Sequence, residues 1–94
     1  MSYVPELTDV ALEDLKNLID SLPSSRRRDA IDAVEAALTK LAANPGLAQR
    51  EHLGRPSYRF GFAAGGVTYH WGCTFKISED ESRIVITHLF RTAL

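Results

Sequence analysis

The second half of the chain carries the side chains best suited to proton transfer and to phosphate binding. Imidazole accepts or donates a proton near neutral pH, and guanidinium offers phosphate a flat pair of N–H donors. Four residues of these two types fall in or beside segments with strand character: Arg59, His70, His88 and Arg91. If the strands bring these side chains together, the cluster could perform general acid–base chemistry on a phosphate ester.

Arg59 and His70 are predicted to lie on the polar sides of two adjacent strands. The nearby Gly61 and Gly72 have no side chains, so we expect open space around the arginine and the histidine. This arrangement would let both groups face the same surface of the sheet.

His88 and Arg91 pose a geometric problem. They are three residues apart, so a regular strand would direct them to opposite faces. A bulge or a strand end near Leu89 would be required to bring both into one site.

The remaining basic groups have weaker claims to function. We expect Arg55 and Lys76 either to contact phosphate or to remain solvated. His52 lies in a polar segment and is expected to have no catalytic role. The run of Arg26, Arg27 and Arg28 stands at the start of a predicted helix, where the macrodipole disfavours cations, but exposed arginines of this kind are usually solvated.

The elements that position these residues are organised around one strand. Apolar and polar residues alternate over 67–77, and the apolar positions are Val67, Tyr69, Trp71, Cys73, Phe75 and Ile77. A period of two predicts a half-buried strand. Its apolar side contains the only tryptophan of the chain and should receive the helices.

Two helices are predicted before this strand. Thr8 is an N-cap candidate, and leucines recur at helical spacing as far as Leu22. A second stripe follows, at Ile31, Val34, Leu38 and Leu41, and the sequence Asn-Pro-Gly over 44–46 ends it. The short connection predicts an antiparallel helix hairpin with one shared apolar seam.

The segments after the helices predict a three-stranded antiparallel meander over 58–62, 67–77 and 83–89. Residues 47–57 are polar and are expected to form an ordered loop. A brief edge strand over 2–4 would be cut short by Pro5. The last strand is apolar on both sides, which places it inside the sheet. The sequence therefore predicts one α+β domain over 1–94, with the helix hairpin on a small, mostly antiparallel sheet of three or four strands.

Composition narrows the classes of protein. The net charge is −1, but residues 1–49 carry five basic and eight acidic groups, whereas 50–94 carry six basic and four acidic groups. Cys73 is the only cysteine and is expected to be a small core residue, so no internal disulfide can form. No metal-ligand spacing, phosphate loop or membrane-spanning run is present in the sequence, so we expect no metal, no cofactor, no membrane partner and a cytoplasmic location.

The order of these segments resembles a known family. A helix hairpin with an Asn-Pro stop is followed by LGRPSYRF, by GVTYHWGCTFKIS, by an acidic turn and by RIVITHLFR. This order is similar to that of the RelE/ParE superfamily of bacterial toxins from type II toxin–antitoxin systems, over nearly the whole chain. The resemblance implies a small cytoplasmic toxin held by an antitoxin protein. It also places basic residues of the family at Arg59, His88 and Arg91.

The resemblance leaves two activities open. A RelE-like toxin would be a metal-independent endoribonuclease, an mRNA interferase that cuts ribosome-bound mRNA, whereas a ParE-like toxin would inhibit DNA gyrase without catalysis. The chain departs from ribonuclease members in its slight acidity, in Tyr69 and His70 where a tyrosine–arginine pair is frequent, and in lacking a terminal tyrosine. We favour the endoribonuclease. A degenerate α+β binding module is the third alternative.

Overall fold

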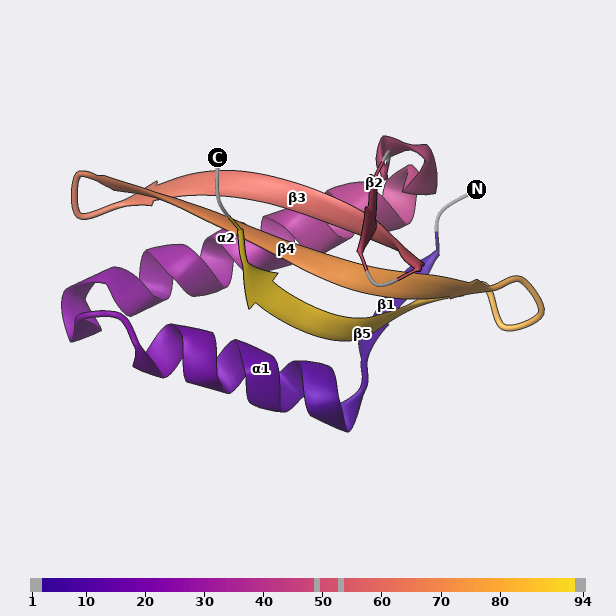
Figure 1. Ribbon diagram of the computed structural model, residues 1–94, viewed down its shortest axis with the longest axis horizontal. Helices are drawn as coiled ribbons and strands as arrows, with labels where there is room; N and C mark the ends of the chain where they lie inside the picture. Colours follow the sequence, from indigo (N-terminus) through magenta and orange to yellow (C-terminus); the bar gives the residue numbers. More distant parts are fainter. Residues whose placement is uncertain (1–2, 49, 53, 93–94) are drawn as a thin grey trace.

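Two helices cover one face of a five-stranded sheet in the computed structural model, which describes residues 3–48, 50–52 and 54–92 (Figure 1). The strand order is β1-β5-β4-β3-β2, and only the β1–β5 pair is parallel. The elements are β1 (Val4–Leu7), α1 (Asp9–Asp20), α2 (Ser24–Ala43), a 3₁₀ turn (Pro45–Leu47), β2 (Arg50–His52), β3 (Arg55–Ala64), β4 (Val67–Ser78) and β5 (Arg83–Arg91). The predicted α+β class, with a helix hairpin on a mostly antiparallel sheet, is confirmed.

The centre of β4 forms the core against the helices. Trp71, Cys73 and Phe75 are almost fully buried, as the alternation predicts, whereas Val67 and Ile77 at the two ends of the strand are exposed. Burial raises the pKa of the Cys73 thiol to about 12, so the cysteine is a protonated core residue. The apolar face of β4 is therefore longer than the surface that the helices cover.

Thr8 ends β1 and begins α1. Its backbone N–H donates to the carbonyl of Ile86, which continues the β1–β5 pairing, and its hydroxyl oxygen accepts from the N–H of Ala11 as an N-cap. Pro5 lies inside β1 and does not end it, contrary to the prediction. The N–H of Val4 donates to the carbonyl of Ser82. Successive backbone nitrogens of an extended strand point to opposite sides, so the nitrogen of Pro5 points away from β5 and its missing N–H costs no hydrogen bond of the sheet. Ser2 lies outside the described residues.

The second helix buries a slightly different stripe from the predicted one. Val34, Leu38 and Leu41 are buried as expected, but Ile31 is 44% exposed and Ala30 takes its place in the core. The helix ends at Ala43, and Asn44 follows as its C-cap, in agreement with the predicted stop. In the part of the chain that the structure describes, neither helix is both long and apolar enough to cross a bilayer.

The segment predicted as a loop over 47–57 contains β2 and the first residues of β3. Arg50 pairs with Ser57, and His52 pairs with Arg55, while Gly54 makes the turn between the strands at a φ of 77°. In Figure 1, β2 lies across the face of the sheet opposite the helices. The loop prediction was wrong here because a short polar strand on an open face has no apolar alternation.

A β-bulge in β5 sets which residues face the helices. Thr74 pairs with His88, but the next residue, Phe75, pairs with Ile86, so Thr87 has no partner in the register. Leu89 therefore faces the helices, as Ile86 does, and both are buried. The strand lies inside the sheet as predicted, because it pairs with β1 on one side and with β4 on the other. Counting the alternation through the bulge would place Leu89 on the same side as Val85, away from the helices.

Candidate functional site

The polar residues of the sheet gather on the face away from the helices, here called the outer face. Strand register places several predicted site residues there, because paired residues share a face. These outer-face residues are Arg55, Arg59, His70, Lys76 and His88. His52 joins them because β2 pairs with β3 and places it beside Arg55.

A cavity of about 290 Å³ opens at one end of this face, and we call it the His52–His88 pocket. It is lined by Asp14, His52, Arg55, Thr74, His88, Leu89 and Phe90. The imidazole of His52 stacks on the ring of Phe90, with 4.4 Å between ring centroids and 19° between the planes. Because β2 lies across the outer face, His52 reaches a residue of β5 although two strands, β4 and β3, separate β5 from β2 in the sheet order.

Asp14 connects α1 to this pocket. Its carboxylate accepts a hydrogen bond from the backbone N–H of Leu89 at 3.1 Å, which occupies a donor of β5 beyond the end of β1. The same oxygen, Oδ2, lies 3.6 Å from Nδ1 of His88. A protonated His88 therefore has an ion-pair partner at Nδ1, and Nε2 is left to face other groups.

Buried hydroxyl groups surround Thr74, which lines the pocket. The hydroxyls of Thr74 and Thr87 are 2.7 Å apart and buried, so the bulge residue is tied to the neighbouring strand. Ser57, opposite Thr74 on β3, is also buried, and its hydroxyl has no hydrogen-bond partner among the described residues. The Thr74–Thr87 hydrogen bond therefore fixes the bulge next to His88.

The outer face is too long for its predicted residues to form one cluster. His70 is four residues from Thr74 along β4, which corresponds to about 13 Å, so it lies well away from His88. Arg59, opposite Gly72, is closer to the pocket but does not line it, and neither does Lys76. Of the phosphate-binding candidates, only Arg55 lines the pocket.

The two glycines expected to leave open space are covered by neighbouring rings. A Cβ on Gly61 would lie 3.3 Å from the imidazole of His70, and a Cβ on Gly72 would lie 3.0 Å from the ring of Phe90. The glycines therefore let the rings of His70 and Phe90 lie flat across the sheet, and the prediction of empty space was wrong.

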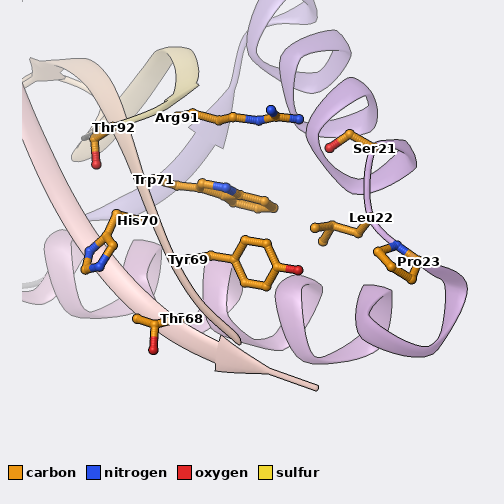
Figure 2. Close-up of a pocket in the computed structure, with 9 residues that line it drawn as sticks. All are labelled: Ser21, Leu22, Pro23, Thr68, Tyr69, His70, Trp71, Arg91 and Thr92. Atoms are coloured by element: carbon orange, nitrogen blue, oxygen red, sulfur yellow. The ribbon is translucent and has the colours of Figure 1, made fainter. Parts of the chain in front are cut away.

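Arg91 lies on the opposite face of the sheet from His88. It pairs with Trp71, a residue buried against the helices, and Figure 2 shows it stretched toward the loop between α1 and α2. The bulge that the single-cluster hypothesis required does exist, but it falls at Thr87, before both residues, and leaves them on opposite faces. The hypothesis that Arg91 and His88 share one site is therefore wrong.

The sequence hypothesis missed His52 and Phe90. Phe90 follows His88 by two residues, so its place on the same face could have been predicted from alternation alone. His52 gave no such signal, because its position depends on how β2 crosses the sheet. Among the described residues, no three His, Cys, Asp or Glu side chains lie close enough to hold a metal ion.

The basic run at the start of α2 has structural contacts. Arg26 donates to the hydroxyl of Tyr69 at 2.9 Å, and Arg28 lies 3.4 Å from Asp32. Arg27 donates to the carbonyl oxygens of Asp20, the last residue of α1, and of Leu22 in the turn, which stabilises the turn between the helices.

No family model matches the chain, and no curated protein matches it in sequence. Solved structures do match its fold. A double mutant of the Escherichia coli toxin RelE in the free state superposes with a TM-score of 0.61 at 13% identity, over 97% of this chain and 84% of that one. The chain has the RelE toxin fold.

Two toxin–antitoxin complexes agree with that assignment. The RelBE2 complex from Mycobacterium tuberculosis matches with a TM-score of 0.61 and 22% identity, over 100% of this chain and 95% of that chain. The intact RelBE complex of E. coli matches with a TM-score of 0.61 and 12% identity, over 99% and 100%. The similarity spans the helices and the sheet together, so it concerns the whole fold.

Proposed function

We propose that this chain is the toxin of a type II toxin–antitoxin pair and acts as a metal-independent endoribonuclease on ribosome-bound mRNA. The observation that carries the proposal is the His52–His88 pocket, where two imidazoles and the guanidinium of Arg55 line one cavity on a RelE-like fold. The similar structures include toxins bound to antitoxins, which supports a cognate antitoxin as the partner.

The proposed reaction divides the work among these side chains. One imidazole removes the proton of the 2′-hydroxyl, whose oxygen forms a bond to phosphorus while the bond from phosphorus to the 5′-oxygen breaks. The other imidazolium gives its proton to that leaving oxygen. Arg55 stabilises the negative charge on the phosphoryl oxygens.

Asp14 suggests which histidine acts as the acid. With an ion-pair partner 3.6 Å from Nδ1, a protonated His88 is held with Nε2–H free to donate. We assign His88 the role of general acid and His52 that of general base. The stacking of His52 on Phe90 would hold the imidazole of His52 in one orientation.

Low charge favours delivery of the substrate by the ribosome. The chain has a net charge of −1, so it should have little of the sequence-independent affinity for RNA that clustered cations supply. A nuclease of this kind needs its substrate to be held in place by something else, and the ribosome presents mRNA in an extended form.

The test is cleavage of mRNA on programmed ribosomes by the purified full chain, mapped by primer extension. We expect H88Q and H52Q each to reduce the cleavage rate by about 10² or more, because each removes one proton-transfer group. The control H70Q makes the same change on the same face about 13 Å away and should cut normally.

Three outcomes would contradict the proposal in different ways. Equal loss with H70Q would favour the cluster predicted from the sequence. Intact mRNA together with inhibition of supercoiling by purified DNA gyrase would favour the ParE-like alternative. Normal growth of cells that express the chain without any partner would favour a binding module.

A further inference from the structure

The two edges of the sheet are protected differently. One edge is β1, where the nitrogen of Pro5 points away from β5, so the open side of that strand lacks a donor. At the other edge, β2 pairs only with residues 55–57 of β3. The rest of β3, residues 58–64, pairs with β4 on one side and with no described strand on the other (Figure 1). This segment contains no proline and no lysine, so it is an open template for pairing with another strand.

The turn between β3 and β4 determines which backbone groups of this edge are open. Gly65 and Gly66 have φ angles of 59° and 77°, as in a two-residue type I′ turn, so Ala64 and Val67 form a hydrogen-bonded pair. Hydrogen-bonded and non-hydrogen-bonded pairs alternate along an antiparallel ladder. Within 58–64, the N–H and C=O groups of the even-numbered residues therefore point to β4, and those of the odd-numbered residues point to the open edge. The residues with open backbone groups are Arg59, Gly61 and Ala63.

The side chains of the open edge form an aromatic row on the helix side. Tyr58, Phe60 and Phe62 stack in sequence, with 6.2 Å and 6.5 Å between successive ring centroids. These rings pack against the core but are only half-buried, because they lie at its border. Arg59 is the only charged residue of 58–64 and lies on the outer face. Apolar surface and open backbone groups thus follow the same line.

A second copy of the chain fits this edge in one register. If two β3 strands run antiparallel about a two-fold axis at Gly61, each Gly61 faces the other, and Arg59 of each copy faces Ala63 of the other. All the open backbone groups of 58–64 are then hydrogen-bonded. Phe60 of each copy faces Phe62 of the other at a non-hydrogen-bonded position, where side chains approach most closely. We propose that the chain forms a two-fold dimer through residues 58–64 of β3, which joins the two sheets into one.

Two properties of the edge favour a second copy over a strand of a different protein. The aromatic row is matched by the same row in reverse, because Phe60 and Phe62 are equally distant from Gly61. The two Arg59 side chains do not face each other, since they lie about 13 Å apart along the strands, so like charges do not oppose the pairing. The His52–His88 pocket is lined by no residue of 58–64, so the dimer uses none of the groups proposed to cleave RNA.

Amide hydrogen exchange tests the pairing residue by residue. The full chain labelled with ¹⁵N is measured in dilute and in concentrated solution, and sedimentation velocity gives the fraction of dimer. We expect the amides of Tyr58, Phe60 and Phe62 to be protected at both concentrations, because they bond to β4. The amides of Arg59, Gly61 and Ala63 should exchange rapidly in dilute solution and become protected as the dimer forms.

Charges placed at Ala63 test the register. A63K sets a lysine opposite Arg59 of the second copy, twice by symmetry, and should weaken dimerisation about tenfold, whereas A63E should strengthen it by a similar factor. T68K is the matched control. It adds the same charge to the same face, but on β4, where Thr68 pairs with Ala63, and it should dimerise as the native chain does. Far-UV circular dichroism and thermal unfolding verify that the variants are folded.

The proposal is overturned if the chain remains a monomer at about 1 mM, where weak association is still detected. It is also overturned if a dimer forms without protection of the Gly61 amide, or if A63K and A63E have the same effect, since the dimer would then use another surface or register. Protection that appears only when a different protein is added would assign the edge to a strand of that protein instead. None of these measurements involves RNA, so a failure of the proposed nuclease activity would not change their outcome.

Discussion

The two faces of the sheet are buried by different means. Against the helices, Trp71 and Phe75 are buried among aliphatic side chains. On the outer face, the buried polar side chains all carry hydroxyl groups: Ser57, Thr74 and Thr87. Burial of apolar side chains stabilises the fold but is non-directional. A hydrogen bond between buried hydroxyls, such as that of Thr74 and Thr87, also fixes how two strands are aligned. Burial on the helix face thus provides most of the stability, whereas the outer face sets the orientation of the side chains proposed to do chemistry.

Removing one phenylalanine from each face gives the largest expected contrast. F75A deletes a ring that is 2% exposed and should lower the free energy of unfolding by about 3–5 kcal/mol. F90A deletes a half-buried ring on the outer face and should cost less than half as much, but it should impair RNA cleavage because His52 loses its stacking partner. Urea unfolding and the ribosome assay measure the two effects.

Equal losses of stability in F75A and F90A would show that the outer face belongs to the core. Full cleavage by F90A would remove Phe90 from the proposed site.

The buried hydroxyl pair tests whether the outer face depends on hydrogen bonding. T74V leaves the Thr87 hydroxyl buried without its partner and should destabilise the chain by about 1–3 kcal/mol. The double variant T74V/T87V removes both hydroxyls and should recover part of that loss. If the double variant is less stable than the sum of the single changes, the pair does not act as a unit.

The pH dependence of stability that comes from Cys73 tests how completely the helix face excludes water. Burial raises the pKa of the Cys73 thiol from about 9 to about 12, so between these pH values the unfolded chain loses a proton that the folded chain keeps. Stability from this group is therefore complete below pH 9 and falls as the pH rises, by at most about 1.4 kcal/mol per pH unit. C73A is the control, because it lacks the thiol; an identical alkaline slope in both chains would show that Cys73 is not responsible.

We expect substitutions at the β1–β5 edge of the sheet to cause the smallest loss of stability. Arg83 lies 2.9 Å from Glu6 and connects β5 to β1, but both side chains are about half exposed. R83Q should cost at most about 1 kcal/mol, and the loss should shrink in high salt. A loss comparable to that of T74V would mean that the β1–β5 edge contributes as much as the outer face.

Much of the fold could be predicted because its signals are periodic. The alternation through Trp71 identified β4 and its buried side, and the helical stripe around Leu38 identified α2. The missed strand β2 and the unexpected place of Leu89 have a common cause. A three-residue polar strand and a one-residue bulge are too short to alter any periodic pattern, yet each changes which side chains face one another.

The candidate site was harder to predict because it combines elements that contact one another only in three dimensions. The residue types that suit phosphate chemistry were recognised, and His88 and Arg55 do line one pocket. Asp14 comes from α1 and His52 from a strand that crosses the sheet, so no spacing in the sequence relates either of them to His88. Alternation alone places Arg91 and His88 on opposite faces, and the single-cluster hypothesis failed because it assumed a bulge near Leu89, whereas the bulge lies at Thr87.

The pairing of β1 with β5 also determines when the chain can fold during its synthesis. Residues 4–7 pair with residues 83–86, so the first strand cannot pair with β5 until the chain has been translated as far as residue 86. Such long-range pairing slows folding, because the intervening chain must be ordered before the contact forms. The same strand supplies His88, so the pocket proposed to cleave RNA can form only after residues 83–91 have been synthesised.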